Sequence, residues 1–226
     1  SILPQMKDMA IKIAGHLKDL GGTERGKIVQ DLAQSYDEPS LRVVVFGEFS
    51  QGKSTLINAL LGREVLPATL IPTTGHVTRI AHGSREKVRV VRLGGGTEEF
   101  AVSDLKRFSL PDNGAACPEV EEIEVLVNCD LLARGMVLLD TPGVNDAEAQ
   151  TRRAKQAIAR ADLVIYLLNS TRLLTANDRD LAVDWLGRQL GKPLVPVVNF
   201  MNQVADEADR RKVRDRMTKW AGRHLR

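Results

Sequence analysis

The chain has 226 residues, enough to bury one substantial core, and one domain with modest additions is the natural count. Its 32 basic and 29 acidic residues leave a net charge of +3, so no strong field argues for nucleic acid and we expect no such partner. The slight basic excess leans mildly toward anionic partners, lipid surfaces included. No apolar run approaches the ~20 residues that cross a bilayer, and no signal peptide is visible.

Two cysteines, Cys117 and Cys129, have neither metal-type spacing nor clustered histidines near them. They are typical of free thiols in a reducing cytosol, and one disulfide between them stays open. The chain begins at Ser1 rather than Met, so we expect a fragment or a trimmed chain.

Apolar periodicity predicts helices and strands that alternate along the chain. The predicted helices are 2–20, 25–36, a helix ending near 61, 103–108, 151–160, 176–190 and 205–223. The predicted strands are 41–46, 77–81, 88–93, 99–102, 120–127, 135–139, 163–168 and 194–198, with a hairpin turn at 94–96 and loops at 66–74 and 111–118. This order predicts an α/β fold, a mostly parallel sheet with helices on both faces and flanking terminal helices. The predicted parts are N-terminal helices (1–38), a core (39–204) and a C-terminal helix (205–226).

The most informative stretch is a buried strand that runs into a glycine-rich loop and then a helix. The loop reads Gly47-Glu48-Phe49-Ser50-Gln51-Gly52-Lys53-Ser54-Thr55 and matches G-x-x-x-x-G-K-[ST]. Its glycines let the backbone wrap a phosphate, and the helix N-terminus adds its positive end. We expect Lys53, an exposed loop charge, to hold the β- and γ-phosphates and Ser54 to give Mg²⁺ a hydroxyl ligand. The pattern predicts a P-loop NTPase.

A second motif indicates which kind of NTPase. The apolar strand at 135–139 ends in Asp140-Thr141-Pro142-Gly143. Asp140, at the carboxyl end of a neighbouring strand, can hold the water shell of Mg²⁺, and the Gly143 N–H can bind a γ-phosphate and move when it leaves. The pair predicts a Ras-like GTPase domain that binds GTP and GDP.

The strand at 194–198 leads into Asn199-Phe200-Met201-Asn202, where many GTPases carry N-K-x-D. The Asn199 side chain can brace the phosphate loop, and the Phe200 ring can stack on the base. Asn202 offers one acceptor and one donor where Asp offers two acceptors, a mismatch with guanine worth ~1–3 kcal/mol. We therefore expect a weakened preference for guanine.

These motifs resemble those of the dynamin superfamily, and most of all bacterial dynamin-like proteins. Residues 47–55 are similar to that family's phosphate loop, G-E-x-x-x-G-K-S-T. Residues 66–74, with 77–80, are similar to its first switch, where Leu-Pro leads to Pro-x-Thr. The resemblance covers about residues 40–200 and breaks at 199–202.

The resemblance implies Mg²⁺-dependent GTP hydrolysis. Thr74 is the expected hydroxyl over Mg²⁺, with Thr73 the second choice, and Ser50 beside Gln51 is expected to neutralise developing charge. Val144 stands where Ras-type GTPases orient water with Gln. The resemblance further implies slow turnover that rises when two GTPase domains meet, in a cytoplasmic protein that remodels or tethers membranes from their inner face.

The role of the terminal helices and two other interpretations of the whole chain stay open. The apolar stripes of the two terminal helices, the second formed by Val213, Met217 and Trp220, fit a neck that passes on the nucleotide state or coverage of the domain's own core equally well. An Era-type ribosome- or RNA-associated GTPase switch is disfavoured by Glu48 and by the Pro-Thr-Thr switch. A relaxed-specificity NTPase or ATPase is supported by Asn202.

Overall fold

A computed structural model of the chain describes residues 9, 12–13, 15–16, 40–48, 50–67, 76–108, 120–142, 148–189 and 191–224. The chain forms two compact units, residues 1–40 and 41–226. In the first unit, the described residues Met9, Lys12, Ile13, Gly15 and His16 are helical, as a helix over 2–20 predicts, and all five are exposed. The rest of that helix and the helix predicted at 25–36 lie outside the described residues.

An eight-stranded sheet forms the second unit, in the order β4-β3-β5-β2-β6-β1-β7-β8. The strands are β1 Leu41–Phe46, β2 Thr78–His82, β3 Lys87–Arg92, β4 Thr97–Phe100, β5 Val120–Val127, β6 Met136–Asp140, β7 Leu163–Asn169 and β8 Leu194–Asn199. Four of the seven pairings are parallel, including the consecutive set β6-β1-β7-β8. The predicted α/β fold with a mostly parallel sheet is confirmed.

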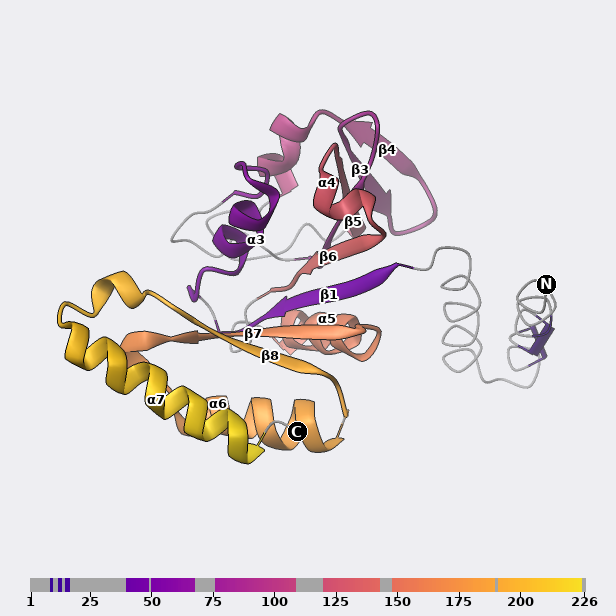
Figure 1. Cartoon of the computed structure of the whole chain (residues 1–226). Helices are drawn as coiled ribbons and strands as arrows, with labels where there is room; N and C mark the ends of the chain where they lie inside the picture. Colours follow the sequence, from indigo (N-terminus) through magenta and orange to yellow (C-terminus); the bar gives the residue numbers. More distant parts are fainter. Residues whose placement is uncertain are drawn as a thin grey trace. The chain divides into compact units, whose positions relative to one another are not determined.

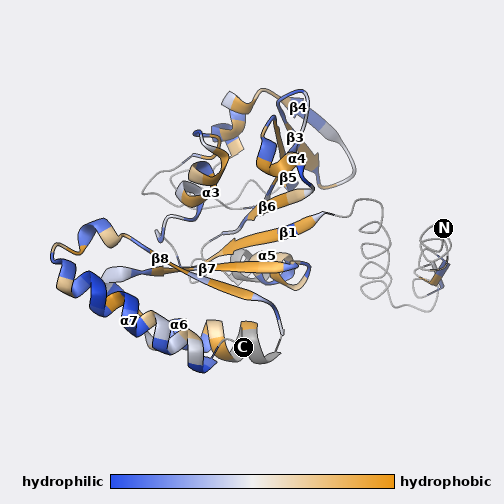
Figure 2. Cartoon of the chain, in the orientation of Figure 1, coloured by the Kyte–Doolittle hydropathy of each residue, from blue (hydrophilic) through white to orange (hydrophobic). Residues whose placement is uncertain are grey.

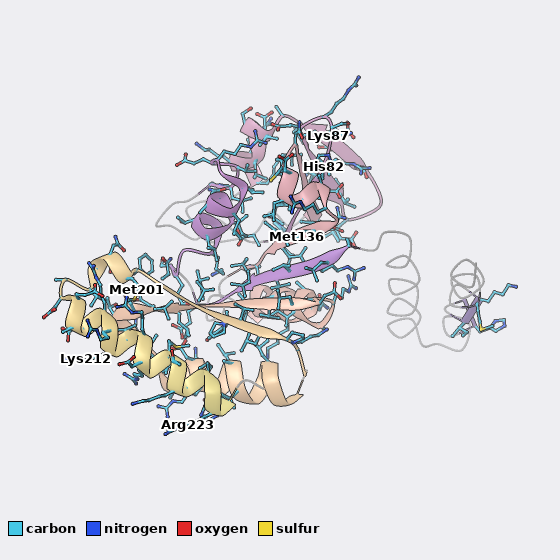
Figure 3. The ribbon with its side chains drawn as sticks, viewed as in Figure 1. His82, Lys87, Met136, Met201, Lys212 and Arg223 are labelled. Atoms are coloured by element: carbon cyan, nitrogen blue, oxygen red, sulfur yellow. The ribbon has the colours of Figure 1, made fainter. Side chains whose placement is uncertain are left out.

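The antiparallel pairings lie on one side of β6. β2 runs against β6, and β3 runs against both β4 and β5. Figure 3 labels His82, at the end of β2, near Met136, at the start of β6, as this antiparallel pairing requires. The carboxyl ends of β6, β1, β7 and β8 therefore meet at one edge, where parallel α/β sheets bind their ligands.

Helices cover both faces of the sheet. The helices are α3 Lys53–Leu61, α4 Asp130–Ala133, α5 Glu148–Ala159, α6 Ala176–Arg179 and α7 Glu207–His224, with 3₁₀ turns η1 Val102–Phe108, η2 Ser170–Arg172 and η4 Met201–Gln203 and a π-helix η3 Asp180–Gln189. Figure 1 shows α3 and α4 on one side of β1 and α6 and α7 on the other. Alternate residues of β1 enter two cores, Val43 and Val45 on the α3 side and Val44 and Phe46 on the α7 side.

The helix at the end of the chain covers its own domain. Met217 and Trp220 are buried in the same core as Val44 and Tyr166, and Val213 packs against that core. Of the two interpretations of the stripe on α7, coverage of the core is therefore the one that the contacts support. Figure 2 shows the rest of α7 as mostly hydrophilic, in contrast to the apolar strands β1 and β7.

Several element boundaries differ from the prediction. The helix expected at 151–160 begins earlier, at Glu148, and the strand expected at 99–102 spans Thr97–Phe100. The helix expected at 176–190 is a single turn of α-helix followed by the π-helix η3, and nothing in the structure explains the wider turn. The four-residue helix α4 was not predicted, because one helical turn carries no periodicity.

Three further sequence expectations concern the described residues. Cys129 is a free cysteine, whereas Cys117 lies outside the described residues. None of the described helices combines the length and apolar character that a membrane crossing requires. The hairpin at 94–96 is confirmed, since Arg92 N donates to Gly96 O at 2.8 Å.

Candidate nucleotide-binding site

The phosphate loop lies between β1 and α3, at the edge where the parallel strands end. Gly52 has a φ of 85°, a left-handed conformation that glycine adopts readily. A Cβ placed on Gly52 would lie 2.4 Å from Asn199 Nδ2, and one on Gly47 would lie 2.6 Å from Gln51 Oε1. Gly52 is therefore favoured by its left-handed backbone, and Gly47 by the Leu167 backbone oxygen, which a Cβ would approach to 2.9 Å.

Lys53 is buried, with 8% of its surface exposed, so the expectation of an exposed loop charge is wrong. The reason is its place in the first turn of α3, from which its side chain turns back over the loop. Its Nζ donates to the carbonyl oxygens of Gly47, at 3.2 Å, and Glu48, at 2.9 Å. The loop thus encloses an ammonium group, held close to backbone atoms that a phosphate would approach.

Ser54 and Asp140 meet beside this lysine. Ser54 Oγ donates to Asp140 Oδ2 at 2.8 Å. Asp140 is 1% exposed, and burial raises its pKa to about 6, while the Ser54 hydrogen bond and the Lys53 charge act in the opposite direction. Its Oδ1 is buried and has no hydrogen-bond partner among the described residues. A buried carboxylate oxygen without a donor, next to a hydroxyl, is a costly arrangement that a cation would relieve.

These residues fit Mg²⁺. Mg²⁺ prefers oxygen ligands and is usually held by one or two carboxylates together with substrate phosphates, rather than by an all-protein cage. The described residues contain no group of three or more His, Cys, Asp or Glu side chains that could hold a metal without a substrate. Ser54 and Asp140 therefore match the ion's preference at a nucleotide site.

The residue after Asp140 fixes the end of its strand. Thr141 Oγ1 donates to Val45 O at 2.9 Å and joins the end of β6 to β1.

The base-reading loop is joined to the phosphate loop by Asn199. Its Nδ2 donates to Gln51 O at 2.8 Å, which is the brace that the sequence predicted. Its Oδ1 accepts from Phe200 N at 2.8 Å. Phe200 is left-handed, with a φ of 61°, and its Cζ would lie 3.8 Å from a Cβ on Gly52. The Phe200 ring therefore stands beside the phosphate loop.

Asn202 follows Phe200 two positions later, in the 3₁₀ turn η4. It is exposed and lines a cavity of about 650 Å³. The other lining residues come from β8, η4 and α7: Val198, Met201, Glu207, Arg210, Val213, Arg214, Met217 and Thr218. Figure 3 labels Met201, which stands between the end of β8 and the start of α7.

The remaining predicted site residues divide into two groups. Ser50, which has a φ of 56°, is exposed, and so is Thr55 in the first turn of α3. Gln51 is buried, and its Oε1 accepts a hydrogen bond from Glu48 N at 3.2 Å. Outside the described residues lie Phe49, Thr73, Thr74, Gly143 and Val144. Sequence reasoning missed two residues that contact the site, Ser170 and Asn177.

Gly52→Ala is expected to weaken nucleotide binding about tenfold or more. The left-handed backbone costs a non-glycine residue about 1–2 kcal/mol, and the new methyl group would displace the Asn199 amide from Gln51. Thermal unfolding and the affinity for a fluorescent GTP analogue measure the two effects. Gly96→Ala is the matched control, since a Cβ there meets nothing within 4 Å. Equal losses in both variants would contradict the packing argument.

The family comparison agrees with this geometry. A family model described as "Dynamin family" matches residues 43–201, well over half of the chain. The chain belongs to the dynamin family. This segment is a dynamin-like GTPase domain, and the match to the dynamin model favours it over the Era-type interpretation.

Among relatives, the bacterial dynamin-like protein of Nostoc punctiforme is 24% identical over 206 residues, which cover 82% of this chain and 29% of that protein. A solved structure of an oligomerised bacterial dynamin pair is 20% identical, with a TM-score of 0.65 over 93% of this chain and 34% of the other. Aquifex aeolicus Era bound to GDP and aluminium fluoride is 19% identical, with a TM-score of 0.50 over 81% of this chain and 48% of the other. These structures show the shared fold. The chain spans less than half the length of the curated relatives it matches.

Proposed function

We propose that this chain binds GTP together with Mg²⁺ and hydrolyses it. The observation that carries the proposal is the meeting of Lys53, Ser54 and Asp140 at one end of the sheet. A cation held by Ser54 and Asp140 would neutralise charge on the phosphates. Lys53 supplies an ammonium group inside the loop, and the backbone N–H groups at the start of α3 complete an anion-binding cradle.

Other groups of the chain have proposed roles in turnover. Ser50 is exposed at the left-handed turn of the loop, where its hydroxyl can face charge that develops in the transition state. The family resemblance assigns Thr74 to the hydroxyl that closes over the metal. Asn199 keeps the base-reading loop in register with the phosphate loop through Gln51. Phe200 supplies an apolar ring at the base side.

In the whole protein, we propose that nucleotide-driven contact between two such domains serves membrane tethering or remodelling, at the inner face of a membrane. The support is the family match and the similar solved structure, whose authors describe an oligomerised bacterial dynamin pair that senses and tethers membranes. Self-association through the GTPase domain is the part of this proposal that the present chain can test.

Phosphate release by this chain, measured over a wide range of protein concentration, tests the proposal. Hydrolysis of GTP should require Mg²⁺, stop in EDTA, and rise in specific activity as the concentration increases. Activity that is flat with concentration would contradict contact between domains, and an inactive chain would contradict hydrolysis. Sedimentation of the full-length protein with anionic vesicles, with and without GTP, tests the membrane role.

A second candidate, a relaxed-specificity NTPase, is favoured by the chemistry of Asn202. Asn202→Asp should tighten GTP about tenfold and loosen xanthosine triphosphate, because a second acceptor suits the guanine edge and an amide donor suits a 2-oxo group. Competition of GTP, ATP and xanthosine triphosphate against a fluorescent analogue measures both. Gln203→Glu adds the same charge at the neighbouring exposed position and serves as the control. A wild type that already selects GTP by several orders of magnitude would show that another group reads the base.

A further inference from the structure

The segment from η2 to α6, which follows β7, contacts both loops of the nucleotide site. Asn177 Nδ2, on α6, donates to Glu48 Oε1 in the phosphate loop. Ser170 Oγ, in η2, donates to Phe200 O in the base-reading loop at 2.8 Å. We propose that Asn177 is a positioning residue for GTP hydrolysis, which holds the Glu48 carboxylate, and with it the phosphate loop, in its working conformation. This inference rests on the proposed function.

Asn177 stands on an anchor that is fixed to the sheet. The first turn of α6 is closed by a capping box, in which Thr175 Oγ1 accepts from Asp178 N at 3.1 Å and Asp178 Oδ2 accepts from Thr175 N at 2.8 Å. Asp178 is 1% exposed, and its Oδ1 accepts from Tyr166 OH at 3.0 Å. Asn177 lies inside this fixed turn, so the position of its side-chain amide is well defined.

The anchor also reaches the strand that leads into the phosphate loop. Tyr166 is fully buried on β7. The centroid of its ring lies 5.7 Å from the ring centroid of Phe46, the last residue of β1. Phe46 directly precedes Gly47. Glu48 follows β1, and the turn that carries Asn177 is attached to β7 through Tyr166. Because β1 and β7 are paired, both partners of the Asn177–Glu48 hydrogen bond have fixed positions at the start of the loop.

The charge of Glu48 explains why a fixed donor is needed. Its backbone oxygen accepts from Lys53 Nζ at 2.9 Å, and its backbone N–H donates to Gln51 Oε1 at 3.2 Å. Its carboxylate belongs to a loop that must receive a polyanion, so a free carboxylate could turn toward Lys53 and compete with the phosphates. The Asn177 amide holds that carboxylate on the α6 side. In this proposal Asn177 acts on the nucleotide through Glu48.

An exchange of the two side-chain types separates this role from a general structural one. Asn177→Asp sets two carboxylates against each other, and kcat/KM for GTP should fall about tenfold or more. Adding Glu48→Gln restores a donor–acceptor pair with its direction reversed, and kcat/KM should return to within about threefold of wild type. Asn128→Asp, exposed after β5 at the opposite edge of the sheet, should leave kcat/KM unchanged. Thermal unfolding of each variant accompanies the kinetics.

The outcomes separate the two proposals. Full activity in Asn177→Asp, or a double variant no better than the single one, would overturn the positioning role alone. A wild-type chain that neither binds nor hydrolyses GTP would overturn the proposed function and this inference with it. Should Asn177→Asp fail to fold, Asn177→Ala removes the donor without adding charge, and an unchanged kcat/KM in that variant would overturn the inference.

Discussion

Lys53→Ala should abolish measurable GTP binding, because the loop loses the ammonium group that meets the phosphates. The buried position of Lys53 adds a second effect. Its Nζ satisfies the carbonyl oxygens of Gly47 and Glu48, so the variant should also lose about 1–3 kcal/mol of unfolding free energy without nucleotide. Equilibrium binding of a fluorescent GTP analogue and urea unfolding measure the two effects separately.

Lys219→Ala is the matched control for this variant. Lys219 is exposed on α7, so its removal changes the net charge equally without touching the loop. We expect unchanged affinity and stability in the control. If Lys53→Ala binds the analogue as tightly as wild type, the assignment of residues 47–55 to phosphate binding is wrong. If it loses binding but no stability, the two carbonyl contacts contribute nothing to the fold.

The phosphate loop and its flanking elements could be predicted because their signals are local. The strand before the loop reads as a continuous apolar run, and residues 43–46 are all buried since the sheet is covered on both faces. The glycines, the lysine and the helix behind them follow in one short stretch. The Asn199 brace was also predictable, because its position relative to the loop is set by the same parallel sheet.

Contacts set by tertiary packing left no comparable signal. The Asn177–Glu48 pair joins residues 129 positions apart, and the helix predicted at 176–190 carries no sign of what its first turn contacts. The burial of Lys53 depends on how α3 turns its first side chain over the loop. The direction of β2 was likewise unpredictable, since a strand's apolar pattern is the same in parallel and antiparallel pairs.

Asp140→Asn should lower GTP hydrolysis about a hundredfold or more and, at the same time, raise the stability of the metal- and nucleotide-free protein. Hydrolysis falls because a neutral amide cannot replace the carboxylate beside Ser54 as a cation ligand. Stability rises because burial raises the Asp140 pKa from 3.8 to about 6, so the ionised group costs on the order of 2–3 kcal/mol in the folded state at neutral pH.

The stability gain of Asp140→Asn should depend on pH. A carboxyl group whose folded pKa lies above its unfolded value destabilises the fold once it is ionised. For Asp140 the effect is full above about pH 6 and absent below the ordinary aspartate pKa of 3.8. The Tm advantage of Asp140→Asn, measured in EDTA, should therefore be largest near pH 7.5 and shrink toward pH 4. Asp180→Asn, at an exposed position in η3, should show neither effect. An advantage that persists unchanged at pH 4 would mean that the amide stabilises the site through new hydrogen bonds rather than by removing a buried charge.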